Sequence, residues 1–493
     1  MKAIVRSTGL LGASTGVTVV CGLASAKLWA IWVGPHGLGY MALLQSLLGI
    51  TSLVVGLGVT AGLVRFGSEP AARADGEALA ALQRAAWLLT ALAACFAVLV
   101  LLLFRGPVGQ LALGRMASST AVPLVAVACV FGLISGVQTG ILNAHHKVAA
   151  LAKFAGLAAI FGTLVEVPFI YIWRSSGVPY AIVATSVVTC GISVLLVRLE
   201  LPRSPAGATS GEVRRQVGAL LRFGLPYTAS MLVGTGVLFL MPVLVLHIVG
   251  PPSVGYYRAA AVIGSTYIGF LLSSMAQDYF PRVSAAAGRP PELARLVNDQ
   301  QKLVLLLGVP TILAALALAP VAVPILYSGR FGAATGVLEW QVAGDVFRLS
   351  SWTLSFVVLA RCGSKTFFAT EVIGGASILF GSIIGMVRFG LPGAGMGYLV
   401  GYAVYYLATW LFVRISASVR LGRSNAVLLA SAVVAIGVAR AASLILGPGI
   451  SMIVTLALAG GFFVYSATII SPGMGGIFTR LASPRRLSAG PSQ

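Results

Sequence analysis

Fourteen apolar runs, each long enough to cross a bilayer, constrain this chain more than any other feature. A spanning helix needs about 20 apolar residues to cross roughly 30 Å of hydrocarbon. Hydrophobic residues make up 58% of the 493 positions and charged residues only 9%, whereas a soluble fold needs about 25% charged residues. We therefore expect an all-α polytopic membrane protein with about 14 transmembrane helices. The runs lie near residues 9–33, 38–64, 82–104, 117–143, 150–173, 178–198, 223–249, 255–281, 301–327, 337–361, 366–388, 395–415, 426–446 and 449–471.

The basic residues predict the orientation of these helices. The formal net charge is +21, and the Lys and Arg residues fall in short clusters between apolar runs. With the N-terminus inside, 24 of them lie in inner segments and only 7 in outer ones. Such a bias places both termini in the cytoplasm. The same clusters indicate anionic membrane lipids, and not nucleic acid, as partners.

A polar break and an internal repeat divide the chain. The break covers residues 199–217 and is rich in Pro, Ser, Gly and Arg. The repeat pairs VGPHGLGYM, beginning at Val33, with VGPPSVGYY, beginning at Val249, at a constant offset of 216 residues. Six runs separate the copies, so both have the same orientation, as in a parallel repeat with its axis along the membrane normal. Each Gly-Pro pair is expected to connect two helices with almost no loop.

These features predict two pseudo-symmetric six-helix lobes plus two C-terminal helices. The expected domains are an N-terminal lobe at 1–198, a cytoplasmic linker at 199–217, a C-terminal lobe at 218–418, two additional helices at 419–479 and a basic cytoplasmic tail at 480–493.

The sequence offers no motif for covalent chemistry. It has no Ser/His/Asp grouping, no paired catalytic carboxylates and no phosphate-binding glycine loop followed by Lys, and its five cysteines lack metal-ligand spacing. We therefore expect neither an ATPase nor a glycosyltransferase, and no metal site or bound cofactor.

Three segments carry a family resemblance. They are AKLWAIWVGPHGLGYMALLQSLLGITSLVVGLGVTAGLVRF near the N-terminus, and GPPSVGYYRAA and QDYFPRVS in the second half. The chain resembles the multidrug/oligosaccharidyl-lipid/polysaccharide (MOP) exporter superfamily and, within it, the Wzx-type O-antigen or polysaccharide flippases. The resemblance implies alternating access by two lobes. The implied substrate is an undecaprenyl-pyrophosphate-linked oligosaccharide, moved from the cytoplasmic to the periplasmic leaflet of the bacterial inner membrane.

The resemblance also implies coupling to an H⁺ or Na⁺ gradient and, as partners, the glycan polymerase and the chain-length machinery. Three alternatives remain open. A lipid II flippase has a similar architecture. A cation or drug antiporter of the same fold should carry an acid where the first run carries Lys27. A membrane-embedded scaffold or polymerase subunit should show a large periplasmic loop.

Ionisable residues inside apolar runs are the candidate site, because a charge at the bilayer centre costs at least about 2.5–3.5 kcal/mol. Arg348 lies near the middle of its run, with Asp345 three residues earlier. Together with Lys27 and Arg258 it is expected to bind the pyrophosphate and glycan in a cavity, since guanidinium groups bind phosphate bidentately. The alternatives are a structural Asp–Arg pair, outward snorkelling of Lys27 and an interfacial anchor at Arg258.

Acids and aromatic residues complete the prediction. Asp345, Glu166 and Glu371 are candidates for ion coupling or charge pairing, because a desolvated carboxylate can carry a proton. A structural role is the alternative for each acid. Trp352, Tyr402 and Tyr405 are candidates for glycan contact, and an aromatic face between helices is the alternative for the tyrosines.

Overall fold

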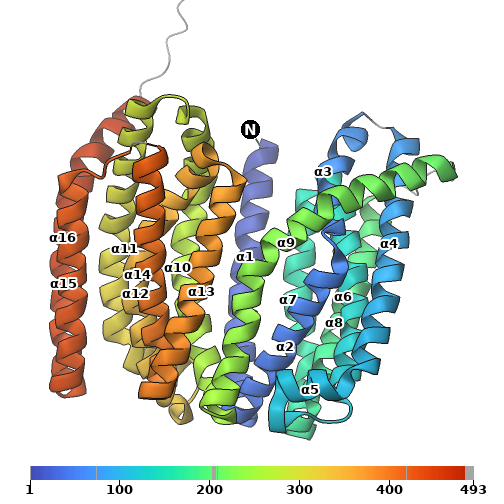
Figure 1. Cartoon of the computed structure of the whole chain (residues 1–493), viewed down its shortest axis with the longest axis horizontal. Helices are drawn as coiled ribbons and strands as arrows, with labels where there is room; N and C mark the ends of the chain where they lie inside the picture. The colour runs from blue at the N-terminus through green and yellow to red at the C-terminus, as the bar shows by residue number, and fades with distance from the viewer. Residues whose placement is uncertain (1, 74, 202–206, 208, 418, 483–493) are drawn as a thin grey trace, which may run out of the picture. The chain divides into compact units, whose positions relative to one another are not determined.

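The computed structural model describes residues 2–73, 75–201, 207, 209–417 and 419–482, and within these ranges it contains helices and no strand (Figure 1). The first half of the chain forms α1 (Lys2–Trp32), α2 (Gly34–Gly56), α3 (Val59–Ala72), α4 (Gly76–Leu103), α5 (Arg105–Leu113), α6 (Ala121–Ala144), α7 (Val148–Trp173) and α8 (Val178–Glu200). The second half forms α9 (Ser210–Ile248), α10 (Pro251–Ala286), α11 (Pro290–Leu326), α12 (Ala333–Val357), α13 (Ser364–Phe389), α14 (Pro392–Ser416), α15 (Arg423–Ile445) and α16 (Pro448–Ala482).

The predicted fold class is confirmed. Twelve stretches of the described helices are long and apolar enough to cross a membrane, and the bent helix α10 adds a thirteenth when its two arms count as one span. One of the twelve, Val148–Glu200, contains both α7 and α8. Large apolar side chains such as Leu99, Val434 and Phe463 are exposed, because lipid tails are their solvent. The chain is an all-α, multi-pass membrane protein.

Two segments differ from the sequence-based boundaries. The apolar run 38–64 is divided between α2 and α3, because Leu57 and Gly58 adopt left-handed conformations with φ of 47° and 63°. The polar segment 199–217 is partly helical: α9 already begins at Ser210, where the Thr209 side chain accepts a hydrogen bond from the Glu212 backbone N–H at 3.4 Å. This is an N-cap, which satisfies one of the free donors at a helix start. Residues 202–206, 208 and 483–493 of the predicted linker and tail lie outside the described residues.

The Gly-Pro turns of the repeat are confirmed. Gly34 has a φ of +70° between α1 and α2, and Gly250 has a φ of +118° between α9 and α10. Glycine adopts such angles without steric cost, and the proline that follows each glycine fits the first turn of a helix. Each pair of helices is therefore connected with almost no loop.

The two copies of the repeat pack against each other through equivalent residues. A Cβ atom added to Gly39 of α2 would lie 3.2 Å from the Pro251 carbonyl oxygen, and one added to Gly255 of α10 would lie 1.9 Å from the Pro35 carbonyl oxygen. Gly39 corresponds to Gly255, and Pro35 to Pro251, at the 216-residue offset. The contact is therefore reciprocal, as expected where two equivalent segments meet around a two-fold axis, and the sequence did not predict it.

The helices pack into two compact units. Unit 1 comprises Met1–Ile263, Val321–Leu338 and Glu371–Gly401, and unit 2 comprises Gly264–Pro320, Glu339–Thr370 and Tyr402–Gln493. In unit 1, α7 packs against α1 and α8, α6 packs against α3, α4 and α8, and α9 packs against α2 and α4. In unit 2, α15 and α16 lie side by side (Figure 1). The lobe boundaries expected from the sequence stay predictions.

Candidate functional site

Arg348 and Asp345 lie one turn apart on α12, within unit 2. Asp345 is buried, with 1% of its side chain exposed, and accepts a hydrogen bond from the Tyr267 hydroxyl of α10. The Arg348 Nη1 lies 3.7 Å from Asp345 Oδ1, which is longer than a hydrogen bond. The carboxylate thus offsets the guanidinium charge through space while Tyr267 holds the carboxylate in place.

Arg348 also keeps an accessible surface. Its side chain is 27% exposed, and its Cζ lies 5.8 Å from the centroid of the Tyr402 ring of α14. A cation beside an aromatic face is stabilised without losing its N–H donors. The structure therefore brings four residues of unit 2 together, and the arginine among them remains accessible to a ligand.

The other predicted aromatic residues pack inside unit 2. Trp352 stacks on Tyr279 with a centroid distance of 5.7 Å and meets Phe356 edge-on at 5.1 Å. Tyr405 is buried and meets Tyr402 edge-on at 6.3 Å. Packing accounts for both Trp352 and Tyr405, and their contact with a glycan stays a prediction. Tyr402 is the predicted aromatic residue that lies beside Arg348.

The remaining two cations belong to unit 1. The Lys27 Nζ donates hydrogen bonds to the carbonyl oxygens of Ile325 at 2.7 Å and Pro324 at 3.4 Å, in the last turn of α11. A cation there satisfies free carbonyl groups and complements the helix dipole. Arg258 donates a hydrogen bond to Gln45 Oε1 of α2 at 3.3 Å. Substrate binding by Lys27 and Arg258 stays a prediction, because the hydrogen-bond acceptors that contact them are groups of the protein itself.

Two further basic residues cap helix ends in unit 1. In the sequence, Arg174 contributed only to the predicted orientation, and His247 had no predicted role. Arg174 donates a hydrogen bond to the Trp32 carbonyl at the end of α1, at 3.3 Å. The His247 ring is 2.8 Å from the Leu111 carbonyl near the end of α5. The position of each residue close to a predicted helix boundary was a signal in the sequence for a capping role. The helix that each one caps could not be predicted from the sequence.

The other two candidate acids belong to unit 1. Glu166 of α7 accepts a hydrogen bond from the Ser25 hydroxyl of α1, within unit 1. Glu371 lies half-buried on α13. Within the described residues, no group of three or more His, Cys, Asp or Glu side chains is arranged to hold a metal ion.

A buried ion pair that the sequence did not predict links α15 to α12 in unit 2. Arg440 pairs with Glu339 and donates a hydrogen bond to Ser443 Oγ at 2.8 Å, and its Cζ lies 4.5 Å from the Trp340 ring centroid. The side chains of Arg440 and Glu339 are only 7% and 13% exposed. The sequence indicated an outer segment for Arg440, and the acid within run 337–361 was the signal that could have identified its partner.

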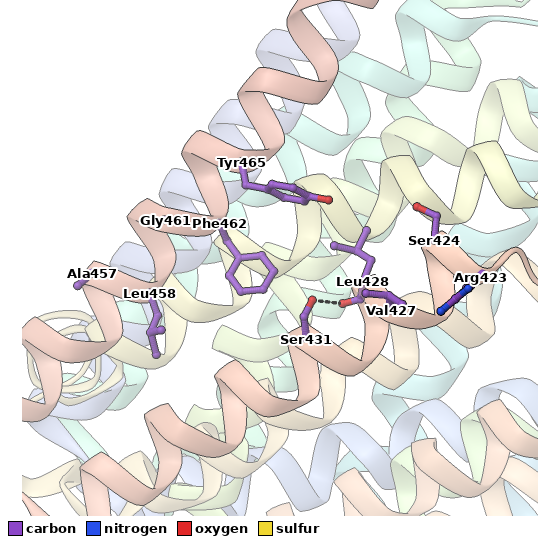
Figure 2. A pocket seen from close by; sticks show the side chains of 10 residues that line it. All are labelled: Arg423, Ser424, Val427, Leu428, Ser431, Ala457, Leu458, Gly461, Phe462 and Tyr465. Carbon is purple, nitrogen blue, oxygen red and sulfur yellow. Dashed lines mark hydrogen bonds between the residues drawn. The ribbon is translucent and has the colours of Figure 1, made fainter.

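Two concave surfaces lie elsewhere. A groove of about 800 Å³ separates α15 from α16, and Figure 2 shows Leu428 and Ser431 of α15 opposite Phe462 of α16. Its lining is mostly apolar, with Arg423 at one end (Figure 2). A pocket of about 690 Å³ lies between α3 and α9 in unit 1, lined by Arg65, Phe66, Gly218, Ala219, Arg222 and Phe223.

Solved structures share this fold. The lipid II flippase MurJ in an inward closed conformation matches with a TM-score of 0.70 and 13% identity, covering 94% of this chain and 99% of that one. An inward-facing multidrug resistance MATE family transporter of the MOP superfamily matches with a TM-score of 0.68 and 19% identity, covering 81% and 94%. These likenesses confirm the expected fold, which the chain shares with both transporters.

Sequence comparison identifies the family. The lipid III flippase of Escherichia coli (strain K12) is 24% identical over 408 residues, which cover 80% of this chain and 94% of that protein. The lipid III flippase of Shigella flexneri matches to the same extent. Residues 30–335, more than half of the chain, match the family described as polysaccharide biosynthesis protein. The chain therefore belongs to the polysaccharide biosynthesis protein family.

Proposed function

We propose that this protein is a Wzx-type flippase of the bacterial inner membrane, with both termini in the cytoplasm. Its substrate would be an undecaprenyl-pyrophosphate-linked oligosaccharide, the repeat unit of an O-antigen or a related polysaccharide, moved from the cytoplasmic to the periplasmic leaflet. The family, the similarity to lipid III flippases and the MOP-type fold support a lipid-linked glycan as cargo. The distribution of Lys and Arg supports the orientation.

Arg348 is the observation that carries the proposal. A pyrophosphate must leave the headgroup region during transfer, and its negative charge then needs a cation inside the membrane. Arg348 supplies one in the middle of a helix, and 27% of its side chain is exposed. A guanidinium presents a planar fork that matches two phosphate oxygens. Lys27 and Arg258 are proposed as further cations on the same path.

Asp345 gives a physical route to ion coupling. When an anionic group engages Arg348, the buried carboxylate of Asp345 loses part of its compensating charge. Uptake of H⁺ or Na⁺ by Asp345 restores neutrality, so substrate binding and ion binding favour each other. Glu166, with its Ser25 hydrogen bond, and Glu371 are proposed as secondary coupling sites.

The competing functions differ in cargo. A lipid II flippase would use the same cations on a different glycan, and the shared fold with MurJ makes it the second candidate. A cation or drug antiporter would need an accessible acid. Asp345 has only 1% of its side chain exposed and is held by Tyr267, whereas Arg348 is the accessible member of the pair. This arrangement favours an anionic cargo.

The decisive experiment deletes the gene and identifies the lipid-linked glycan that accumulates on the inner leaflet. Restoration by the wild-type gene and transport of that glycan in proteoliposomes under an imposed H⁺ or Na⁺ gradient complete the test. Accumulation of lipid II would support the second candidate. Extrusion of cationic dyes without any lipid-linked glycan accumulating would reject a flippase function.

A further inference from the structure

The pocket between α3 and α9 combines two arginines with two phenylalanines. Arg65 and Phe66 come from α3, while Arg222 and Phe223 lie one turn beyond the small residues Gly218 and Ala219 of α9. The Arg65 Cζ lies 4.8 Å from the centroid of Phe223 and 5.7 Å from that of Phe66. Stacking against an aromatic face orients a guanidinium and leaves its N–H edge open to an anion.

The positive charge of the pocket is not compensated by an ion pair with any residue that the structure describes. Within the described residues, neither Arg65 nor Arg222 has a carboxylate in an ion pair, and both side chains are exposed. The acids one turn or more away on the same helices already have partners. Glu69 pairs with Arg73 at 2.7 Å and Glu212 with Arg215 at 2.8 Å. The two arginines are therefore available to an external anion.

Both arginines stand at the end of a long stretch of the sequence that has no charged residue. No Lys, Arg, Asp or Glu lies between Lys27 and Arg65, and none lies between Arg222 and Arg258. Each arginine is thus the charged residue at the end of a long uncharged stretch, on the side that the Lys and Arg bias assigns to the cytoplasm. Basic residues in such positions are the ones that attract anionic lipid headgroups.

Direct backbone contact holds the walls of the pocket together. A Cβ on Gly224 of α9 would lie 1.9 Å from the Leu57 carbonyl oxygen, and a Cβ on Gly58 would lie 3.0 Å from the Gly224 Cα. Beneath them, Leu63 of α3 and Leu220 of α9 are fully buried in one apolar cluster. The arginines therefore project from a preorganised frame, which lowers the entropic cost of binding.

We propose that this pocket binds the headgroup phosphate of an anionic phospholipid in the cytoplasmic leaflet. Two arginines at headgroup depth match one phosphate, and the phenylalanine walls match the apolar start of the acyl chains. A free phosphate ion would satisfy only the arginines. The proposal rests on the orientation proposed above but not on the identity of the transported glycan.

The test measures lipid binding to the full-length protein after purification in detergent and removal of bound lipid. Native mass spectrometry gives the dissociation constants for dioleoyl phosphatidylglycerol and for dioleoyl phosphatidylcholine. The wild type should bind the first more tightly. Arg65→Ala with Arg222→Ala should weaken the tightest phosphatidylglycerol site about 30-fold, because each arginine near a headgroup contributes a factor of about five. Phe223→Leu should weaken it about two- to fivefold by removing the stacking face.

Matched variants distinguish lipid binding in this pocket from a general attraction of anionic lipids to a positively charged protein. Arg295→Ala with Arg420→Ala removes two exposed arginines outside the pocket, and its tightest site should stay unchanged. Arg65→Gln with Arg222→Gln keeps the side-chain bulk, so a loss of phosphatidylglycerol affinity in this variant reports the missing charge and not altered packing. Thermal unfolding checks each variant. Equal losses in the pocket and control variants, or sodium phosphate displacing the lipid from its tightest site, would overturn the proposal.

Discussion

Two arginines of unit 2 face acids of the same helix, α12, and they do so in different ways. Arg440 comes from α15, pairs directly with Glu339 and is 7% exposed. Arg348 lies on α12 itself, stands 3.7 Å from Asp345 and is 27% exposed. The acid of the first pair is engaged by the arginine, whereas the acid of the second is held by the Tyr267 hydroxyl.

The difference separates a structural charge from an accessible one. Removing one member of a buried pair leaves an uncompensated charge, so a tight pair acts as an anchor between helices. An arginine that keeps 27% of its side chain exposed, as Arg348 does, can be reached by an anion. The identity of the residue does not distinguish the two cases. The geometry of the partner does.

The largest expected effect is on the anchor. Glu339→Ala should lower the free energy of unfolding by about 3–5 kcal/mol, because Arg440 is left buried without its carboxylate. Thermal and denaturant unfolding in detergent would measure it. Glu339→Leu combined with Arg440→Met removes both charges at similar volume and should recover most of the loss. A single variant as stable as the wild type would show that Arg440 finds other compensation.

Arg348→Ala should act on transport instead. We expect flipping to fall about 100-fold, the effect of losing charge-assisted hydrogen bonds to the substrate, while the protein stays inserted and folded. Arg348→Lys should keep partial activity, because the charge remains and the planar fork is lost. Accumulation of the lipid-linked glycan, normalised to protein abundance, is the measurement.

A double variant tests whether Arg348 is an anchor after all. If it serves only to neutralise Asp345, then Asp345→Asn with Arg348→Ala should restore flipping, since no buried carboxylate is left without compensation. If Arg348 binds substrate, the double variant should remain as inactive as Arg348→Ala. Restored flipping would show that Arg348, like Arg440, has a structural role.

The sequence predicted the helices better than it predicted their partners. Apolar length fixes a spanning helix locally, so all fourteen runs correspond to helices, and the Gly-Pro turns at Gly34 and Gly250 behave as expected. The break at Leu57 was missed because it depends on the contact between that segment and Gly224 of α9, which lies far along the chain. Backbone contacts between distant helices leave no mark on hydropathy.

The candidate site was predictable in part for the same reason. Spacing on one helix placed Asp345 beside Arg348, because residues three apart share a face. The Tyr267 bond and the pairing of Arg440 with Glu339 join different helices, and no local pattern reports them. Trp352 was a candidate for glycan contact, yet its ring packs on Tyr279 of a different helix.

Lys27 is intermediate between the paired Arg440 and the accessible Arg348. Its described hydrogen bonds go to backbone carbonyl groups and not to an acid. Lys27→Met should lower the free energy of unfolding by about 1–2 kcal/mol, because the end of α11 loses its cap. Lys27→Arg keeps the charge and serves as the control. A loss of flipping as large as that of Arg348→Ala, with stability preserved, would instead assign Lys27 to substrate binding.

The smallest expected effect concerns Tyr402, which separates stacking from glycan contact. If the ring only supports Arg348, Tyr402→Phe should flip at the wild-type rate, because the aromatic face remains 5.8 Å from the guanidinium. Tyr402→Leu should then lower the flipping rate about two- to fivefold, the value of one cation–π contact. The same substitution should have no effect in an Arg348→Lys background, because lysine stacks less well on the ring than arginine does. If the hydroxyl instead bonds the glycan, Tyr402→Phe should lose at least as much as Tyr402→Leu. Flipping rates in proteoliposomes decide between support of Arg348 and contact with the glycan. Only a loss in Tyr402→Phe would give Tyr402 a role of its own, separate from that of Arg348.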